Sequence, residues 1–444
     1  MKPNIFFLTI DSLREDKAYG PNKSSLTPNI NSLIEKGAHF TQAISTSDAT
    51  GLSLGSIFTA AYPFKTGITH FSYNQDVPNY FELLKKNGYN LYATVPDVSF
   101  FLKMAANFTE KDAYVYDKRD SWVQLAGGIG NMVVDRLETK LKDPWVYFVH
   151  LMDLHAPFYL PPEFDSEKYG KTRYDKMISS IDSWLGKFLQ KIDLQKTLVV
   201  ISADHGDYIP VTDTAPKKET KLRSFLKMGK KTLPSLEPIG VKLLTTANSL
   251  KKSYDYNKLK KELTEDELRT MDSRGQWHLY DELIRIPLIF SGFGVSSKKI
   301  TTQVRHVDIF PTIMDILGLQ NLQSDIHGTS LRPVIEGKST EELVAYVETG
   351  SRDPKKLGNI IGIRTPQYKY LRSRDDPNSN VSLFDLKSDP SEKTNLAESK
   401  QELVQEMENL LLQVRKNSIK QEMAEMDDAE TKKIQEELKK LGYL

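Results

Sequence analysis

Four short apolar runs, each followed at once by polar residues, limit what this chain can fold into. The runs are residues 5–10, 145–151, 197–203 and 286–290. Runs of this length with helical patterns between them are typical of parallel buried strands in an α/β protein. In such sheets, ligands bind outside the carboxyl ends of the strands. Three of the runs end beside residues able to do acid–base or metal-binding chemistry, namely Asp11, Asp153, His155, Asp204 and His205.

The composition excludes several classes of protein. The chain has 444 residues and no cysteine, which rules out disulfides, thiolate metal sites and a cysteine nucleophile. Its 60 Lys and Arg residues balance 59 Asp and Glu residues, which argues against binding nucleic acid with the whole surface. No apolar run approaches the roughly 18 residues of a membrane span, and the first run ends at Asp11 without a cleavage site. We therefore expect a cytoplasmic protein with no transmembrane segment and no nucleic-acid partner.

The pattern along the chain predicts three parts. Residues 1–340 form the main α/β domain, residues 341–398 form a small subdomain, and residues 399–444 form a helical tail. Helices are expected at 28–36, 81–86, 172–192 and 307–317, and short antiparallel strands at 343–347, 359–363, 368–371 and 381–384. The tail is a packing helix in the plain interpretation, and a helix that allows oligomerisation in the alternative.

A basic helical insertion is expected at about residues 208–275, where lysines outnumber acidic residues until Glu262. One interpretation is a solvated pair of helices. The other is a basic surface that recruits an anionic substrate or a membrane.

A polar stretch at residues 45–53 leads into apolar residues at helical spacing, so Thr50 lies at or near a helix N-terminus. Its hydroxyl could be a plain N-cap. Alternatively, an anion bound there would meet free backbone N–H groups and the positive end of the helix dipole. Thr50, Asp11, Asp204 and His205 together make an oxygen-rich donor set that suits a divalent metal ion, Mn²⁺, Mg²⁺, Ca²⁺ or Zn²⁺. A metal ion held there could lower the pKa of the threonine hydroxyl.

An ordered series of motifs runs along the chain. It comprises residues 3–14, 27–43, 56–63, 150–157, 202–207, 279–288, 307–312, 327–331, 368–371 and 383–390. These motifs resemble the sulfatase family of the alkaline phosphatase superfamily over about residues 3–397, apart from the basic segment. The resemblance implies an alkaline-phosphatase-like, mostly parallel sheet flanked by helices, with a small C-terminal antiparallel sheet. It also implies an anionic ester substrate, which could be a small molecule, a glycan or a lipid headgroup.

The resemblance also implies roles for individual residues. Asp11, Asp204 and His205 would hold the metal ion, and Thr50 falls on the position of the nucleophile and would also touch the metal. His155 would contact the sulfate or phosphate oxygens, and His278 could protonate the leaving group. His150 and Asp153 would lie behind these residues or help to form another metal site, His39 and His70 are expected to be structural, and His306 and His327 are left unassigned.

Three departures from the family pattern limit which reactions of the family this site could catalyse. Sulfatases carry Cys or Ser, oxidised to formylglycine, where this chain has Thr50, and threonine cannot give that aldehyde because its Cβ bears a methyl group. Leu52 and Leu54 stand where the family has Pro and Arg, and Ser12 stands where a second acidic residue is expected. The site therefore resembles the Thr-nucleophile members more closely, such as phosphodiesterases, nucleotide pyrophosphatases, and the lipoteichoic acid synthase and phosphoethanolamine transferase types.

These observations predict a metal-dependent, sulfatase-like hydrolase or transferase of phosphate or sulfate esters that uses a threonine nucleophile. One alternative is a true sulfuric ester hydrolase that works without formylglycine. The other is a catalytically inactive protein that binds anionic glycans or lipids through the basic segment.

Overall fold

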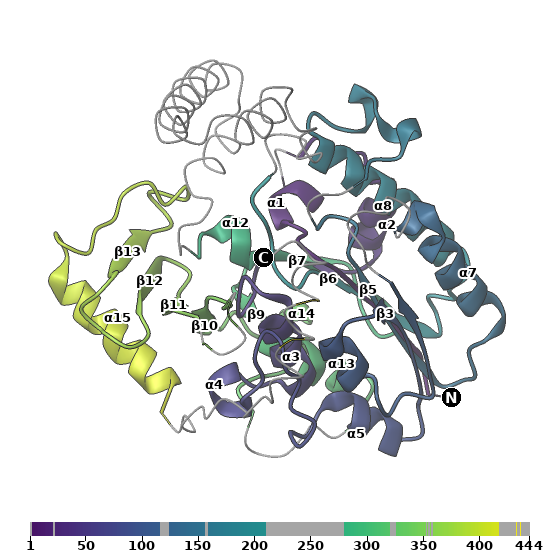
Figure 1. The fold of residues 1–444 in the computed structure, drawn as a ribbon, viewed down its shortest axis with the longest axis horizontal. Helices are drawn as coiled ribbons and strands as arrows, with labels where there is room; N and C mark the ends of the chain where they lie inside the picture. The colour runs from purple at the N-terminus through teal and green to yellow at the C-terminus, as the bar shows by residue number, and fades with distance from the viewer. Residues whose placement is uncertain are drawn as a thin grey trace, which may run out of the picture. The chain divides into compact units, whose positions relative to one another are not determined.

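A nine-stranded, mostly parallel sheet forms the main layer of the described chain in this computed structural model (Figure 1). Its strand order is β4-β3-β5-β1-β6-β7-β2-β8, and β9 pairs with β2. The strands are β1 (Asn4–Ile10), β2 (Ala38–Ile44), β3 (Asn90–Pro96), β4 (Glu110–Tyr114), β5 (Trp145–Leu151), β6 (Thr197–Ser202), β7 (Arg285–Gly292), β8 (Lys298–Ile300) and β9 (Val304–Arg305). The structure describes residues 2–20, 23–115, 124–155, 159–209, 279–319 and 326–416, without 352, 354, 355 and 357 and with the single residues 432 and 436.

The first three apolar runs are parallel strands, as predicted, and the fourth is not. β1 lies between β5 and β6 and is parallel to both. β7 runs antiparallel to β6 and to β2. The expectation that residues 286–290 form a parallel strand is therefore wrong, because an apolar run buried on both faces carries no information about its direction.

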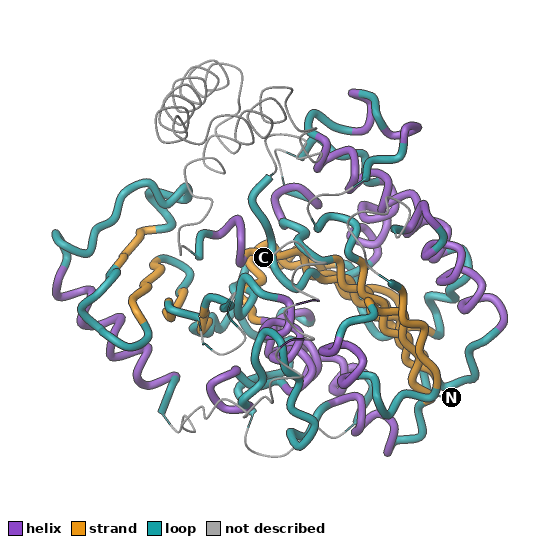
Figure 2. Tube along the Cα trace, in the orientation of Figure 1, coloured by secondary structure: helices purple, strands orange, loops and turns teal. Residues whose placement is uncertain are grey.

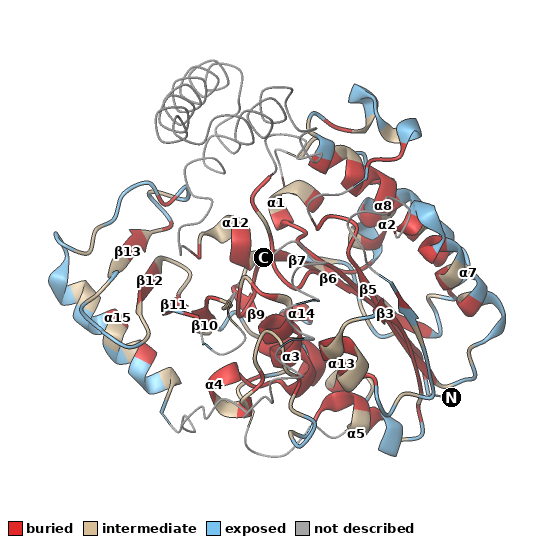
Figure 3. Cartoon of the chain, in the orientation of Figure 1, coloured by how far each residue is buried: buried red, intermediate tan, exposed pale blue. Residues whose placement is uncertain are grey.

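Helices cover both faces of the large sheet, as Figures 1 and 2 show. Consecutive residues of β1 point to opposite faces: the ring of Phe6 packs against Phe188, at 6.4 Å between centroids, and that of Phe7 against Phe310, at 5.8 Å. The Phe6 face carries α2 (Pro28–Lys36), α7 (Ile129–Thr139) and α8 (Arg173–Leu189). The Phe7 face carries α3 (Thr50–Thr59), α5 (Tyr80–Lys86) and α13 (Ile309–Ile316). Figure 3 shows the strands between these layers as buried.

Shorter helices complete the described chain. They are α1 (Glu15–Ala18), α4 (Pro63–Thr66), α6 (Ser99–Met104), α12 (Asp281–Ile284) and α14 (Arg332–Ile335), with 3-10 turns η1 (Leu125–Gly127), η2 (Pro162–Phe164), η3 (Glu167–Tyr169) and η5 (His306–Asp308). The helices predicted at 28–36, 81–86, 172–192 and 307–317 are confirmed within a few residues. Of the helical tail predicted at 399–444, α15 (Gln401–Val414) is a helix, and the part from 417 on lies outside the described residues except for 432 and 436. No helix among the described residues is long and apolar enough to cross a membrane.

A four-stranded antiparallel sheet follows the large sheet in the chain, as predicted. Its order is β10-β11-β12-β13, formed by β10 (Ala345–Glu348), β11 (Ile360–Arg364), β12 (Tyr368–Ser373) and β13 (Ser382–Asp385). Helix α15 packs on it through Met407 and Leu411, which are fully buried with residues of β10 to β13. The described residues belong to one unit, made of residues 1–207 and 277–444, except for Tyr208 and Ile209. The rest of the basic segment predicted at 208–275 lies outside the described residues.

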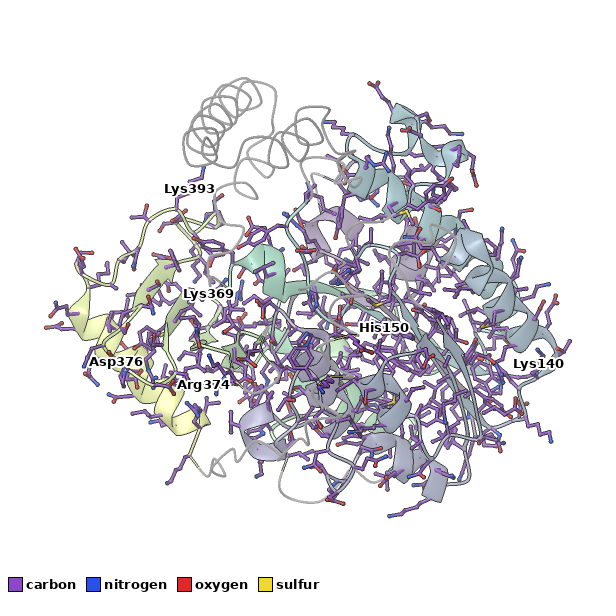
Figure 4. All side chains as sticks on the ribbon, viewed as in Figure 1. Lys140, His150, Lys369, Arg374, Asp376 and Lys393 are labelled. Atoms are coloured by element: carbon purple, nitrogen blue, oxygen red, sulfur yellow. The ribbon has the colours of Figure 1, made fainter. Side chains whose placement is uncertain are left out.

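A buried ion cluster ties β12 to the start of α12. The ammonium group of Lys369, labelled in Figure 4, is fully buried and lies 2.7 Å from both Asp281 Oδ1 and Glu392 Oε1. It also donates to the carbonyl oxygen of Leu279. Arg364 pairs with the other oxygen of Asp281 at 2.8 Å. Because each carboxylate keeps a cationic partner, the cluster avoids leaving a charge buried and unpaired.

Candidate active site

The ends of β1 and β6 bring Asp11 and Asp204 to the same edge of the large sheet. Thr9 of β1 pairs in register with Ser202 of β6, so the residues that follow the two strands emerge side by side. The backbone N–H of Ser12 donates to Asp204 Oδ1 at 3.2 Å, and the Ser12 hydroxyl donates to Asp11 Oδ1 at 2.6 Å. Ser12 has φ 63°, a left-handed conformation that is uncommon outside glycine and that occurs at functional sites.

His205 completes a three-residue cluster with the two aspartates. One ligand atom from each of Asp11, Asp204 and His205 lies within 4.8 Å of the others, and all three side chains are buried. His205 Nδ1 lies 2.7 Å from the carbonyl oxygen of Gly206. Since a carbonyl only accepts, Nδ1 carries the proton and Nε2 faces the cluster, 3.5 Å from Asp204 Oδ2.

The pKa values of the residues in this cluster are shifted because two carboxylates are held close together. Burial would raise the pKa of Asp11, but a hydrogen bond with His150 and the charges of His155 and His205 hold it below its ordinary value. Burial and the charge of Asp11 raise the pKa of Asp204. Burial opposes protonation of His205, but Asp204 and Asp11 raise its pKa to about 9. Positive charge is therefore favoured between the two carboxylates.

Thr50 begins α3 and directs its hydroxyl into this cluster. Thr50 Oγ1 donates to Asp11 Oδ2 at 3.2 Å and lies 3.5 Å from His205 Nε2. The N-cap residue is Ala49, and no side chain of the described residues caps the helix. The plain N-cap interpretation of Thr50 is therefore wrong, and the first backbone N–H groups of α3 are not used by a capping side chain.

The end of β5 and the segment after it bring further predicted residues to this edge. His155 is 7% exposed, and its charge lowers the pKa of Asp11. His150, labelled in Figure 4, is fully buried, with Nε2 3.7 Å from Asp11 Oδ2 and Nδ1 2.8 Å from the Thr9 hydroxyl. Asp153 accepts from the backbone N–H of Leu125 at 3.0 Å, and burial raises its pKa to about 7. His278 lies outside the described residues.

His70, which the sequence left as structural, belongs to the surroundings of the cluster. Burial and the charge of His205 lower its pKa to about 4, and the charges of Asp11 and His155 also act on it. Its backbone carbonyl lies where a Cβ on Gly51 would come within 2.3 Å, so only glycine fits directly after Thr50. No sequence signal distinguishes His70, because only the tertiary structure places its loop beside the start of α3.

The cluster fits a divalent cation on two observations. Asp204 Oδ2 is buried and accepts no hydrogen bond within the described chain, so one carboxylate oxygen is left for another partner. The donor set of two carboxylates, one imidazole and one hydroxyl is also typical of such ions. Asp11, Asp204, His205 and Thr50 are the residues that would hold it.

Comparison with known proteins agrees with this geometry. A family model described as Sulfatase matches residues 3–319, and one described as N-sulphoglucosamine sulphohydrolase, C-terminal, matches residues 267–417. Arylsulfatase K of Gallus gallus is 23% identical over 92% of this chain and 82% of its own length.

Solved structures share the fold. Phosphonate monoester hydrolase of Agrobacterium radiobacter superposes with a TM-score of 0.65 at 16% identity, covering 94% of this chain and 96% of the other. A protein solved in complex with its substrate D-glucosamine-2-N,6-O-disulfate superposes with a TM-score of 0.62 at 15% identity, covering 94% of this chain and 99% of the other. Because the family model spans more than half of the chain, this protein belongs to the sulfatase family and is an ester hydrolase.

Proposed function

We propose that this chain is a metal-dependent hydrolase of anionic esters in which Thr50 is the nucleophile and no formylglycine is formed. The position of the Thr50 hydroxyl carries the proposal, because it lies within hydrogen-bonding distance of Asp11 Oδ2 at the uncapped start of α3. A divalent cation bound by Asp11, Asp204 and His205 would lower the pKa of this hydroxyl and offset the charge of the substrate.

In the proposed first step, the Thr50 hydroxyl, whose pKa a bound cation would lower, gives its proton to solvent, Oγ1 attacks the phosphorus or sulfur in line, and the bond to the ester oxygen breaks. The departing oxygen takes a proton, for which His155 is the candidate donor among the described residues. The intermediate is a threonine ester whose anionic oxygens face the first N–H groups of α3. Water then attacks the same centre and gives a proton to His155, the bond to Thr50 Oγ1 breaks, and Thr50 takes a proton back from solvent.

Phosphodiesters and phosphonate monoesters are the proposed preferred substrates. Threonine carries a single hydroxyl on Cβ, so no second hydroxyl on that carbon can expel the bound anion. The threonine ester must therefore be cleaved by water, a displacement well suited to phosphorus. The likeness to a phosphonate monoester hydrolase supports this preference at the level of the fold.

Sulfate esters are the second candidate. The relative named arylsulfatase K and the neighbour bound to a disulfated glucosamine support them. An oligomer formed through the C-terminal helix and a cytoplasmic location stay predictions.

The test is an initial-rate panel with nitrophenyl esters of a phosphodiester, a phosphonate, a phosphate monoester and sulfate, each with Mn²⁺, Mg²⁺, Ca²⁺ or Zn²⁺. Thr50→Ala should lower kcat/KM by about a thousandfold or more, since it removes the attacking atom. It should lower the free energy of unfolding by only about 1 kcal/mol, the loss of one hydrogen bond. Thr50→Ser keeps the hydroxyl and should remain within about tenfold of the native rate.

Substrate preference decides between the two candidates. Faster turnover of phosphodiester or phosphonate supports the first, and faster turnover of sulfate the second. If Thr50→Ala keeps the native rate on every ester, the proposed nucleophile is wrong.

A further inference from the structure

The peptide of Asp204 is held by hydrogen bonds on both sides. On one side, the Ala203 carbonyl oxygen lies 3.1 Å from His306 Nε2. On the other, the carbonyl oxygen of Asp204 itself accepts from the Ser45 hydroxyl at 2.8 Å. Both donor residues are buried, with 1% and 0% of their surface exposed.

His306 is committed to this contact. It lies on η5, which packs against α3, the helix that begins with Thr50. Because the Ala203 carbonyl can only accept, Nε2 must carry the proton. Nδ1 is buried and has no hydrogen-bond partner in the described part of the chain, and burial lowers the pKa of His306 to about 3. The ring is therefore neutral, and its single N–H is used on the Ala203 carbonyl, just before Asp204.

Ser45 connects the same loop to α3. Its oxygen accepts from the Ser47 N–H at 3.2 Å and lies 3.1 Å from Ser53 Oγ, one turn after Thr50. The Ser53 hydroxyl donates to the Ser47 carbonyl at 3.0 Å, and the Ser45 hydroxyl lies 2.5 Å from that same oxygen, so the single proton of Ser45 is shared between the carbonyl oxygens of Ser47 and Asp204. Two loops and one helix thus meet at one buried hydroxyl group.

The side chain of Asp204 is fixed on one oxygen only. Its Oδ1 accepts from the backbone N–H groups of Ser12, at 3.2 Å, and His205, at 2.8 Å. Its Oδ2 is the bare oxygen that faces the cluster. With Oδ1 occupied, the direction of Oδ2 depends on where the Asp204 backbone lies, and that backbone is held by His306 and Ser45.

We propose that His306 and Ser45 are positioning residues that hold the Asp204 peptide so that Oδ2 points at the cation and keeps its position relative to Thr50. The inference rests on the proposed metal-dependent function. Groups that orient a metal ligand commonly change metal affinity by about 10- to 100-fold when they are lost. Neither residue touches the cation or the substrate, so each acts through Asp204.

The experiment measures the Mn²⁺ dissociation constant of the purified full chain by isothermal titration calorimetry. His306→Asn and Ser45→Ala should each weaken Mn²⁺ binding by about tenfold or more. His306→Gln should stay within about threefold of the native chain, because its amide N–H can reach the position of Nε2 and that of asparagine cannot.

Thr312→Ala is the matched control for Ser45→Ala. Thr312 is also fully buried, and its hydroxyl bonds the carbonyl oxygen of Asp308 and the N–H of Leu331 away from the cluster. The Thr312→Ala variant should have a lower melting temperature in EDTA than the native chain but the same Mn²⁺ dissociation constant.

The outcomes separate the two proposals. If the native chain binds no Mn²⁺, the proposed metal-dependent function fails, and the inference fails with it. If the native chain binds Mn²⁺ and both His306→Asn and Ser45→Ala bind within threefold of it, the positioning role is overturned and the metal site stands. If His306→Gln loses as much affinity as His306→Asn, the hydrogen bond to Ala203 is not the cause.

Discussion

Replacing Ser12 with aspartate would place a third carboxylate beside Asp11 and Asp204. The Ser12 hydroxyl is 2.6 Å from Asp11 Oδ1, and its left-handed backbone is one that aspartate tolerates. Two carboxylates about 4 Å apart repel by about 4 kcal/mol at an effective dielectric constant of 20. Without a cation, Ser12→Asp should lower the free energy of unfolding by up to about 4 kcal/mol. A bound cation relieves the same repulsion, so the affinity of Ser12→Asp for the cation should exceed that of the native chain by up to about a thousandfold.

The assay is thermal denaturation in EDTA and in saturating Mn²⁺, with calorimetry for the dissociation constant. Ser12→Asn is the matched control, since it has nearly the same shape and no charge. We expect Ser12→Asp to melt below Ser12→Asn in EDTA and to gain more from Mn²⁺. Equal melting temperatures and equal affinities for the two variants would refute the reasoning, because position 12 would then not act on a cation site.

Two further predictions concern stability. Asp153 is protonated in the folded chain up to about pH 7 and in the unfolded chain only near its ordinary value of 3.8, so folding takes up a proton between these values and stability falls as pH rises. In urea unfolding, the free energy of unfolding of Asp153→Asn relative to that of the native chain should therefore rise by about 2 to 3 kcal/mol between pH 5 and pH 8. A difference that does not change with pH would contradict this. Lys369→Met should cost about 3 to 5 kcal/mol, because it leaves buried carboxylates without their shared partner. The control is Arg332→Met, because the Arg332 side chain is 45% exposed in its ion pair with Glu336. This variant should lower the free energy of unfolding by less than about 1 kcal/mol. Equal losses for the two variants would show that burial is not the reason.

Much of the site followed from local sequence patterns. An apolar run that ends in an acidic residue identifies both a strand and the edge where its ligand-binding residues emerge, and this located Asp11 and Asp204. The apolar period after Thr50 located the start of α3. Short strands near the C-terminus were found because their alternation and turns are local properties.

Other features depended on contacts between distant residues. The direction of β7 is set by its neighbours β6 and β2, and an apolar run looks the same in either direction. Whether Thr50 caps its helix or serves the cluster is decided by Asp11, which is 39 positions away.

The sequence by itself determined the fold class, the family resemblance and the residues able to bind a metal ion or attack an ester. The tertiary structure alone decided which of the remaining polar residues support them. His306 and Ser45 meet the Asp204 loop across 103 and 159 positions of sequence, and no local pattern indicates either contact. The reason is physical: periodicity reports which face of an element is buried, whereas a hydrogen bond between loops depends on how the elements pack.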